Sequence, residues 1–341
     1  MFIHKLYSLL LLIFLGSLVA PKAFGQHALG DEPVPFKPAG YYIAALTDER
    51  AEKTAITGDI TMASISQYFA HNVQKNTSQI PVVITVKVFS VTEIPYGKGV
   101  DGRITLQLSF GLEKNYGVEP LTAYSGALNY KRSAGNATAM DRDLRSILKA
   151  SLVYFNNWIQ SNRDLNRKLA KNVKINFTDY TEYPEGDTIY YSAKRPLTWS
   201  DFQSKNRPSS KFMALVMPSL GYTQEARLVN GTIEVKIAVK AFLPKSACYA
   251  DAMGRNDYAL NHEQRHFDIV KIISEQFKQQ ILAKPLTPDT FEAIINIQYL
   301  DSFRDMNAMQ KAYDQETSHG LNHVAQEAWN RRIDKELKSF H

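Results

Sequence analysis

The chain contains a single cysteine, Cys248, among its 341 residues. One cysteine excludes an internal disulfide, so each domain must be held together by its own hydrophobic core. Cys248 is expected to be a buried strand residue, because an unpaired cysteine behaves as a small hydrophobic side chain. With 44% hydrophobic and 22% charged residues, the composition is that of a globular protein, and the length suggests about two domains.

A large excess of one charge sign is also missing, with 40 basic and 34 acidic side chains. The densest basic run, "NRKLAKNVK" at 166–174, is typical of a solvated helix end rather than of a stripe that binds phosphates. The sequence therefore predicts no nucleic-acid partner.

The apolar run at 6–20 is too short to span a membrane as a helix, which requires roughly 20 residues. Lys5 precedes it, and Ala23-Phe24-Gly25 follows as a small-x-small cleavage site. This succession predicts a signal peptide over 1–25, which would make the mature protein secreted or periplasmic with no stable membrane span. No cysteine follows the run, so no site for an N-terminal lipid is expected.

Residues 26–186 are expected to form an N-terminal α+β domain with a linker at its end. The period-two runs "YYIAAL", "PVVITVKVFSV", "GRITLQLSFGL" and "LTAYSGALNYK" predict strands of an antiparallel sheet. Helical spacing in "TMASISQYFAHNVQ" and "DRDLRSILKASLVYFNNWIQSN" predicts helices that pack on this sheet. No acid pair, nucleophile elbow or phosphate loop indicates a role for this domain, and "KINFTDYTEYPEGD" is interpreted as the strand-poor linker.

Residues 187–341 are expected to form the second domain. The runs "TIYYSA", "FMALVMPSLGY" and "TIEVKIAVKAFL" predict a short sheet, and helices are predicted near 257–283, 288–316 and 320–338. The first of these helices, with Asp257 as its N-cap, carries His262, Glu263 and His266. Its apolar face contains both histidines, whereas Asp268 is predicted to lie on the opposite face.

Two histidines four residues apart on the buried face of a helix need polar partners away from water. One metal ion satisfies both rings, and Glu263 is then placed to act as a general base toward a water molecule on that ion. This is the HExxH arrangement of zinc peptidases, in which His262 and His266 bind Zn2+.

A third zinc ligand must come from elsewhere, because the usual third histidine shortly after the motif is absent. Candidates lie in "AYDQETSHGLNHVAQEAW" at 312–329. His319 is ranked first because Gly320 predicts a tight turn there, Glu316 and Asp314 follow, and His323 is last. Asp314 is alternatively an acceptor for the free N–H group of a ligand histidine.

Three segments resemble a bacterial family of predicted secreted zinc-dependent proteases: "RPLTWSDFQ", "HEQRHFDI", and "YDQETSHG" with the later Gln326 and Trp329. The resemblance covers roughly residues 187–337. It implies a zinc peptidase in which His262 and His266 are ligands and Glu263 is the base.

Together these patterns predict an exported α+β protein whose second domain is zincin-like and hydrolyses peptide bonds in polypeptide substrates. One alternative is a zinc amidase that acts on cell-wall peptides. Another is a non-enzymatic cell-envelope binding or assembly module with a structural metal. Glu263 favours an enzyme, because a structural metal site has no use for a base beside its first ligand.

Overall fold

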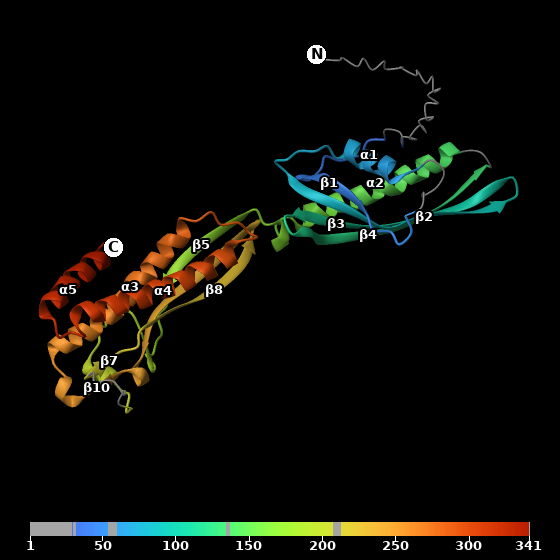
Figure 1. Cartoon of the computed structure of the whole chain (residues 1–341). Helices are drawn as coiled ribbons and strands as arrows, with labels where there is room; N and C mark the ends of the chain where they lie inside the picture. The colour runs from blue at the N-terminus through green and yellow to red at the C-terminus, as the bar shows by residue number, and fades with distance from the viewer. Residues whose placement is uncertain (1–28, 30–31, 54–59, 134–136, 207–212, 341) are drawn as a thin grey trace, which may run out of the picture. The chain divides into compact units, whose positions relative to one another are not determined.

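The structure of the chain is a computed structural model that describes residues 29, 32–53, 60–133, 137–206 and 213–340 (Figure 1). It contains helices and sheets, which confirms the mixed α and β class, and it divides into two compact units, Met1–Trp158 and Ile159–His341. The predicted signal peptide lies outside the described residues. Within the described part of the chain, no helix has the length and apolar character needed to cross a membrane.

The first unit is built on one four-stranded sheet with the order β1-β2-β3-β4. Its elements are β1 (Tyr41–Asp48), α1 (Met62–Asn72), β2 (Ile80–Tyr96), β3 (Gly99–Lys114), β4 (Gly117–Ser133) and α2 (Ala137–Asn162). Only the β2-β3-β4 part is antiparallel, because β1 pairs with β2 in parallel. The expectation of an antiparallel sheet is therefore wrong for β1, since the connection through α1 is a crossover that returns the chain in the same direction.

One face of this sheet is buried beneath α2. Along β3, Ile104, Leu106, Leu108 and Phe110 are buried while the residues between them are more exposed. The ring of Phe155 in α2 stacks on Phe110 with the centroids 4.3 Å apart. The period-two pattern of the sequence thus corresponds to one helix-covered face.

The second unit has β9 as the central strand of its larger sheet. Along β9, β8 pairs antiparallel, β5 pairs parallel and β6 pairs antiparallel near its end, while β7 and β10 form a separate two-stranded sheet. The strands are β5 (Asn172–Asp179), β6 (Thr188–Tyr190), β7 (Ala214–Leu215), β8 (Ser219–Val229), β9 (Thr232–Pro244) and β10 (Tyr249–Ala250). The helices are α3 (Asp257–Leu282), α4 (Phe291–Thr317) and α5 (His323–Lys338), with short 3-10 helices at Arg167–Leu169, Trp199–Asp201, Lys245–Ala247 and Ala252–Gly254.

The segment interpreted as a linker contains β5, which differs from the sequence-based expectation. Because β5 pairs with β9 over eight residues, it belongs to the second unit, and the boundary lies at Trp158 rather than near residue 186. Cys248 is fully buried as expected, but it lies just before β10 rather than inside a strand.

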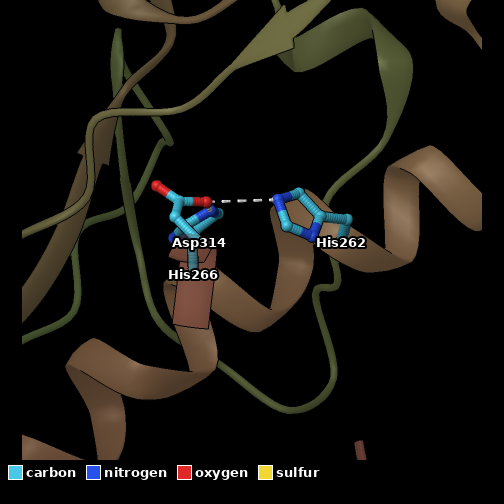
Figure 2. A group of neighbouring side chains, drawn as sticks. All are labelled: His262, His266 and Asp314. Carbon is cyan, nitrogen blue, oxygen red and sulfur yellow. Dashed lines mark ion pairs between the residues drawn. The ribbon is translucent and has the colours of Figure 1, made fainter. Parts of the chain in front are cut away.

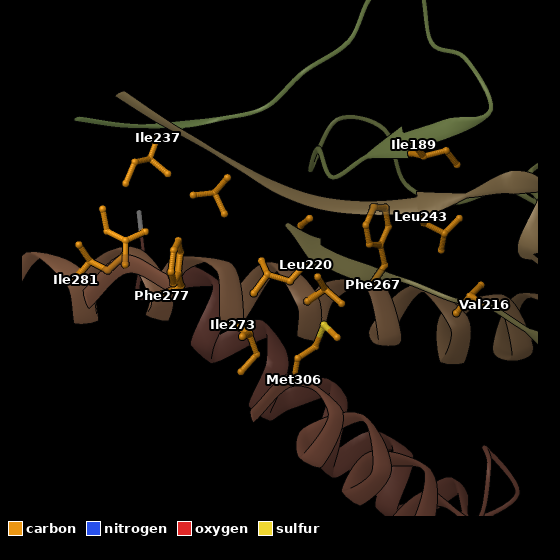
Figure 3. Packing of buried hydrophobic residues seen from close by; sticks show 14 of the residues in the cluster. Ile189, Val216, Leu220, Ile237, Leu243, Phe267, Ile273, Phe277, Ile281 and Met306 are labelled. Carbon is orange, nitrogen blue, oxygen red and sulfur yellow. The ribbon is translucent and has the colours of Figure 1, made fainter. Parts of the chain in front are cut away.

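Helix α3 packs against the sheet on one side and against α4 on another (Figure 3). Helix α4 also contacts β8 directly, where the Tyr299 and Tyr222 rings lie 5.2 Å apart. Phe267, Val270 and Phe277 pack in the core shared with β9, whereas Ile269 and Ile272 pack against α4 and α5. The helix is therefore buried on more than the one face that its amphipathic pattern predicts.

Asp268 shows this most clearly, because the sequence places it on the exposed side and the structure buries it. Its carboxylate accepts hydrogen bonds from Tyr191 at 3.0 Å, Gln264 at 2.8 Å and Arg265 at 2.9 Å. Asp268 also forms an ion pair with Arg265.

Candidate metal centre

The N-terminal half of α3 presents His262, Glu263 and His266 to a cleft. The helix begins at Asp257, and its N-cap is Asn256 rather than the predicted Asp257, because the Asn256 side chain accepts the Ala259 N–H at 2.9 Å. His262 and Glu263 are buried, and the His266 side chain is 12% exposed. The spacing of four residues brings the two imidazole rings to a centroid separation of 4.9 Å.

Asp314 on α4 faces both histidines (Figure 2). Its Oδ1 atom lies 3.5 Å from Nε2 of His262 and 3.1 Å from Nε2 of His266. These three residues form a group whose ligand atoms all lie within 4.8 Å of one another. Two neighbouring helices thus bring two ring nitrogens and one carboxylate oxygen to a common point.

The other ring nitrogen of each histidine is held by a glutamine. Nδ1 of His262 donates to Oε1 of Gln326 on α5 at 2.9 Å, and Nδ1 of His266 donates to Oε1 of Gln310 on α4. An amide oxygen only accepts hydrogen bonds, so each Nδ1 carries the hydrogen. In the neutral rings, both Nε2 atoms therefore direct a lone pair toward Asp314.

Two further residues hold the His262 ring in its orientation. The Tyr313 ring stacks on it with the centroids 4.8 Å apart, and the Tyr313 hydroxyl donates to the His262 carbonyl at 3.3 Å. Gly320 lies close to the same ring, since a Cβ at this position would be 3.3 Å from Nδ1 of His262. Tyr258 fixes this glycine by donating to its carbonyl at 2.7 Å.

The charges at this point favour a cation, which is either a metal ion or a protonated histidine ring. Oδ1 of Asp314 is buried and receives no hydrogen bond from the described residues, although three ring nitrogens lie near it. Oxygen and nitrogen ligands about 2.0–2.2 Å from a tetrahedral zinc ion lie roughly 3.3–3.6 Å from one another. The separations of 3.1 and 3.5 Å agree with this geometry to within a few tenths of an ångström.

The pKa shifts of Asp314 and His266 have the same electrostatic cause, which is the closeness of the carboxylate to the rings. Burial acts to raise the pKa of Asp314, but His262 and His266 outweigh burial and hold this pKa far below its usual range. Burial acts to lower the pKa of His266, but the Asp314 carboxylate outweighs it and raises this pKa. The carboxylate is therefore ionised and ready to bind a proton-bearing ring or a metal ion.

Glu263 lies in the wall of the same cleft, which has a volume of about 830 Å³. Burial raises the pKa of Glu263, while the two histidines and a backbone hydrogen bond at Val216 act in the opposite direction. A buried carboxylate beside a site that can bind a metal ion can exchange a proton with a ligand in the cleft.

The remaining predicted candidates lie around this group in different roles. His319 lines the cleft and is 44% exposed, and its Nδ1 atom is 3.3 Å from Oδ1 of Asp314. Glu316 accepts a hydrogen bond from the Trp329 indole at 2.8 Å. His323 stacks on Tyr258 with the centroids 4.2 Å apart. Asp314, which the sequence ranks below His319, is the one that completes the group with His262 and His266.

The glutamines that orient the rings were not predicted from the sequence. Gln310 lies four residues before Asp314, so helical spacing could have placed both on one face of α4. For Gln326, nothing in its spacing from His262 along the sequence indicates a contact. That contact depends on how α5 packs against α3.

Comparison with protein-family models finds no match, and no curated protein matches the chain. Among solved structures, a minor lipoprotein from Acinetobacter baumannii matches with 16% identity and a TM-score of 0.21. The match covers 35% of this chain and 94% of that chain. A similarity at this level carries no argument about the fold or the function.

Proposed function

We propose that the chain is an exported zinc-dependent metallopeptidase that hydrolyses peptide bonds in polypeptides, with a zincin-like second unit. The observation that carries the proposal is the convergence of Nε2 of His262, Nε2 of His266 and Oδ1 of Asp314 on one point. Two imidazoles and a carboxylate are a ligand set of catalytic zinc sites, which leave one position for water or substrate.

Asp314 is the proposed third ligand, in preference to His319. Its carboxylate faces the Nε2 atoms, whereas Gln326 and Gln310 accept the Nδ1 hydrogens, so Asp314 does not take the outer-acceptor role considered from the sequence. His319 is more exposed than the other candidates in the group and lies beside the carboxylate.

Zinc bound by these residues would polarise the scissile carbonyl and lower the pKa of a water molecule toward 7. Glu263 is the proposed general base, which takes a proton from the attacking water and passes it to the leaving amine. The buried surroundings of Glu263 exclude bulk water from this proton transfer. Gln326, Gln310 and Tyr313 hold the histidine rings in the orientation that binding requires.

Two alternatives use the same residues in another way. A zinc amidase that acts on cell-wall peptides would need the same ligands and the same base, so only its substrates distinguish it. A non-enzymatic envelope module with a structural metal would need no base, and the buried carboxylate of Glu263 in the cleft argues against it.

The test is metal analysis of the purified protein followed by comparison of wild type with Glu263→Gln. The wild type should contain one zinc ion per chain and cleave members of a diverse pool of peptides. Glu263→Gln should keep its zinc and its thermal stability, while kcat falls by about 10²–10⁴-fold, the usual contribution of a general base. A zinc-loaded wild type that cleaves neither peptides nor cell-wall fragments would favour the structural-metal module.

A further inference from the structure

The cleft beside the metal group has an apolar wall. Residues 213–218 form this wall, which includes β7 and the connection to β8. β7 is held in place by pairing with β10, and the backbone of Val216 is close enough to Glu263 to act on its pKa. The wall therefore lies beside the proposed general base.

Three large apolar side chains of the cleft are exposed to solvent, and Met213, at 38%, is the least exposed of them. Met217 is 57% exposed and directly follows Val216, whose backbone contacts Glu263. Leu321 is 82% exposed and directly follows Gly320, which lies against the His262 ring. Each of these two side chains is thus one residue away from a backbone group at the site. Exposed apolar groups gathered at one cleft indicate a surface that a ligand covers.

The described residues of the cleft offer few charged groups that could recognise a terminus of a peptide substrate. Among the described residues that line the cleft, none is a lysine or an arginine, and the only carboxylates are Glu263 and Asp314. Recognition of a substrate's terminal carboxylate normally uses a guanidinium or an ammonium group. Recognition of a terminal amine would require a carboxylate, but both carboxylates are already assigned to the metal and the base.

We infer that the cleft binds an internal segment of a polypeptide that carries large apolar side chains beside the scissile bond, with Met217 and Leu321 as specificity determinants. This inference rests on the proposed hydrolytic function and narrows it to endopeptidase activity. Methionine is unbranched and adaptable, so Met217 suits apolar side chains of several shapes.

The test uses peptides of one length with acetylated and amidated ends that differ only in the two residues around the central bond: leucines, lysines or glutamates. Zinc-loaded wild type should cleave the leucine peptide with a kcat/KM at least about 10-fold above that of the others. Met217→Glu and Leu321→Glu should lose this preference and favour the lysine peptide. Leu300→Glu is the matched control, because Leu300 is an exposed apolar residue of α4 that does not line the cleft.

A wild type that requires a free terminus, or substitutions that leave the selectivity unchanged, would overturn the inference. Binding of the same blocked peptides to zinc-loaded Glu263→Gln, measured by fluorescence anisotropy, separates this outcome from failure of the proposed function. Suppose that the wild type cleaves none of the peptides, yet Glu263→Gln binds the leucine peptide and loses this binding when Met217 is also replaced. In that case only the proposed hydrolysis is refuted. If wild type cleaves all three peptides equally, only the apolar specificity is refuted, and absence of both cleavage and binding refutes both.

Discussion

Replacing Gln326 with methionine tests whether the glutamine orients a metal ligand. Gln326 is fully buried, and its amide oxygen accepts the Nδ1 hydrogen of His262 at 2.9 Å. Its amide nitrogen donates to Tyr313 at 2.6 Å and to Asn330 at 3.0 Å. Methionine has a similar length and fits the same volume, so the main loss is the polar contacts.

The expected magnitude follows from the groups left without partners. Tyr313 can still donate to the His262 carbonyl, and Asn330 still accepts from Arg265 at 3.1 Å. Among the described residues, the Nδ1 hydrogen of His262 has no other acceptor, and a buried donor left unsatisfied costs about 2 kcal/mol. For a unit of this size, such a loss lowers Tm by about 4–8 °C. Zinc affinity should fall by roughly 10–100-fold, because the His262 ring is no longer held.

The assay is chelator competition for zinc at 25 °C, combined with thermal unfolding of the same samples. Gln326→Glu is the informative control, because a carboxylate still accepts the Nδ1 hydrogen but cannot donate to Tyr313 or Asn330. It should lose stability while zinc affinity stays at or above that of wild type. Ile333→Val, in the core beneath α5, should cost about 1 kcal/mol without changing zinc affinity. Gln326→Met with a wild-type zinc affinity would refute the positioning role of Gln326.

Three further predictions concern the third ligand, the turn after α4 and the response to acid. Asp314→Asn should abolish stoichiometric zinc binding whereas His319→Ala should keep it, and the reverse result by metal analysis would reassign the ligand. Gly320→Ala should weaken zinc binding and cost roughly 1–2 kcal/mol in unfolding experiments, because φ is +81° and the new methyl group would be 3.3 Å from a ligand ring. Burial acts to raise the pKa of Asp201, but Arg195 outweighs burial and lowers this pKa. The ion pair therefore stabilises the fold above about pH 4, and this stabilisation is lost as pH falls through the lowered pKa. Asp201→Asn should therefore cost about 2 kcal/mol at pH 7, because Arg195 keeps its second partner Glu185, and its unfolding free energy should approach that of wild type in acid. A constant difference from pH 7 to pH 2 would refute this.

Local patterns in the sequence determined most of the secondary structure. The alternation in β3 and the apolar stripe of α2, with Leu144, Ile147, Leu148 and Leu152 all buried, follow from periods of two and 3.6 residues. The spacing of His262 and His266 also placed both rings on one side of α3. Such features are readable because they depend on neighbours within one or two turns of a helix or along one strand.

Tertiary packing decided what depended on distant residues. Strand β5 has a short alternation of its own in Val173, Ile175 and Phe177, but only its pairing with β9, far along the chain, decides that it belongs to the sheet of the second unit. Asp268 is buried because Tyr191 and Arg265 satisfy its carboxylate, which an amphipathic projection of α3 cannot reveal.

The third member of the metal group was also decided by packing. Asp314 belongs to the regular helix α4, so the packing of α4 against α3 places its carboxylate opposite the Nε2 atoms of His262 and His266. His319 lies beyond the helix end, where Ser318, His319 and Gly320 all have positive φ angles, and this turn leaves its side chain 44% exposed. The sequence narrowed the candidates to a few residues, but the direction in which each side chain points depends on backbone geometry and helix docking, which no local spacing encodes.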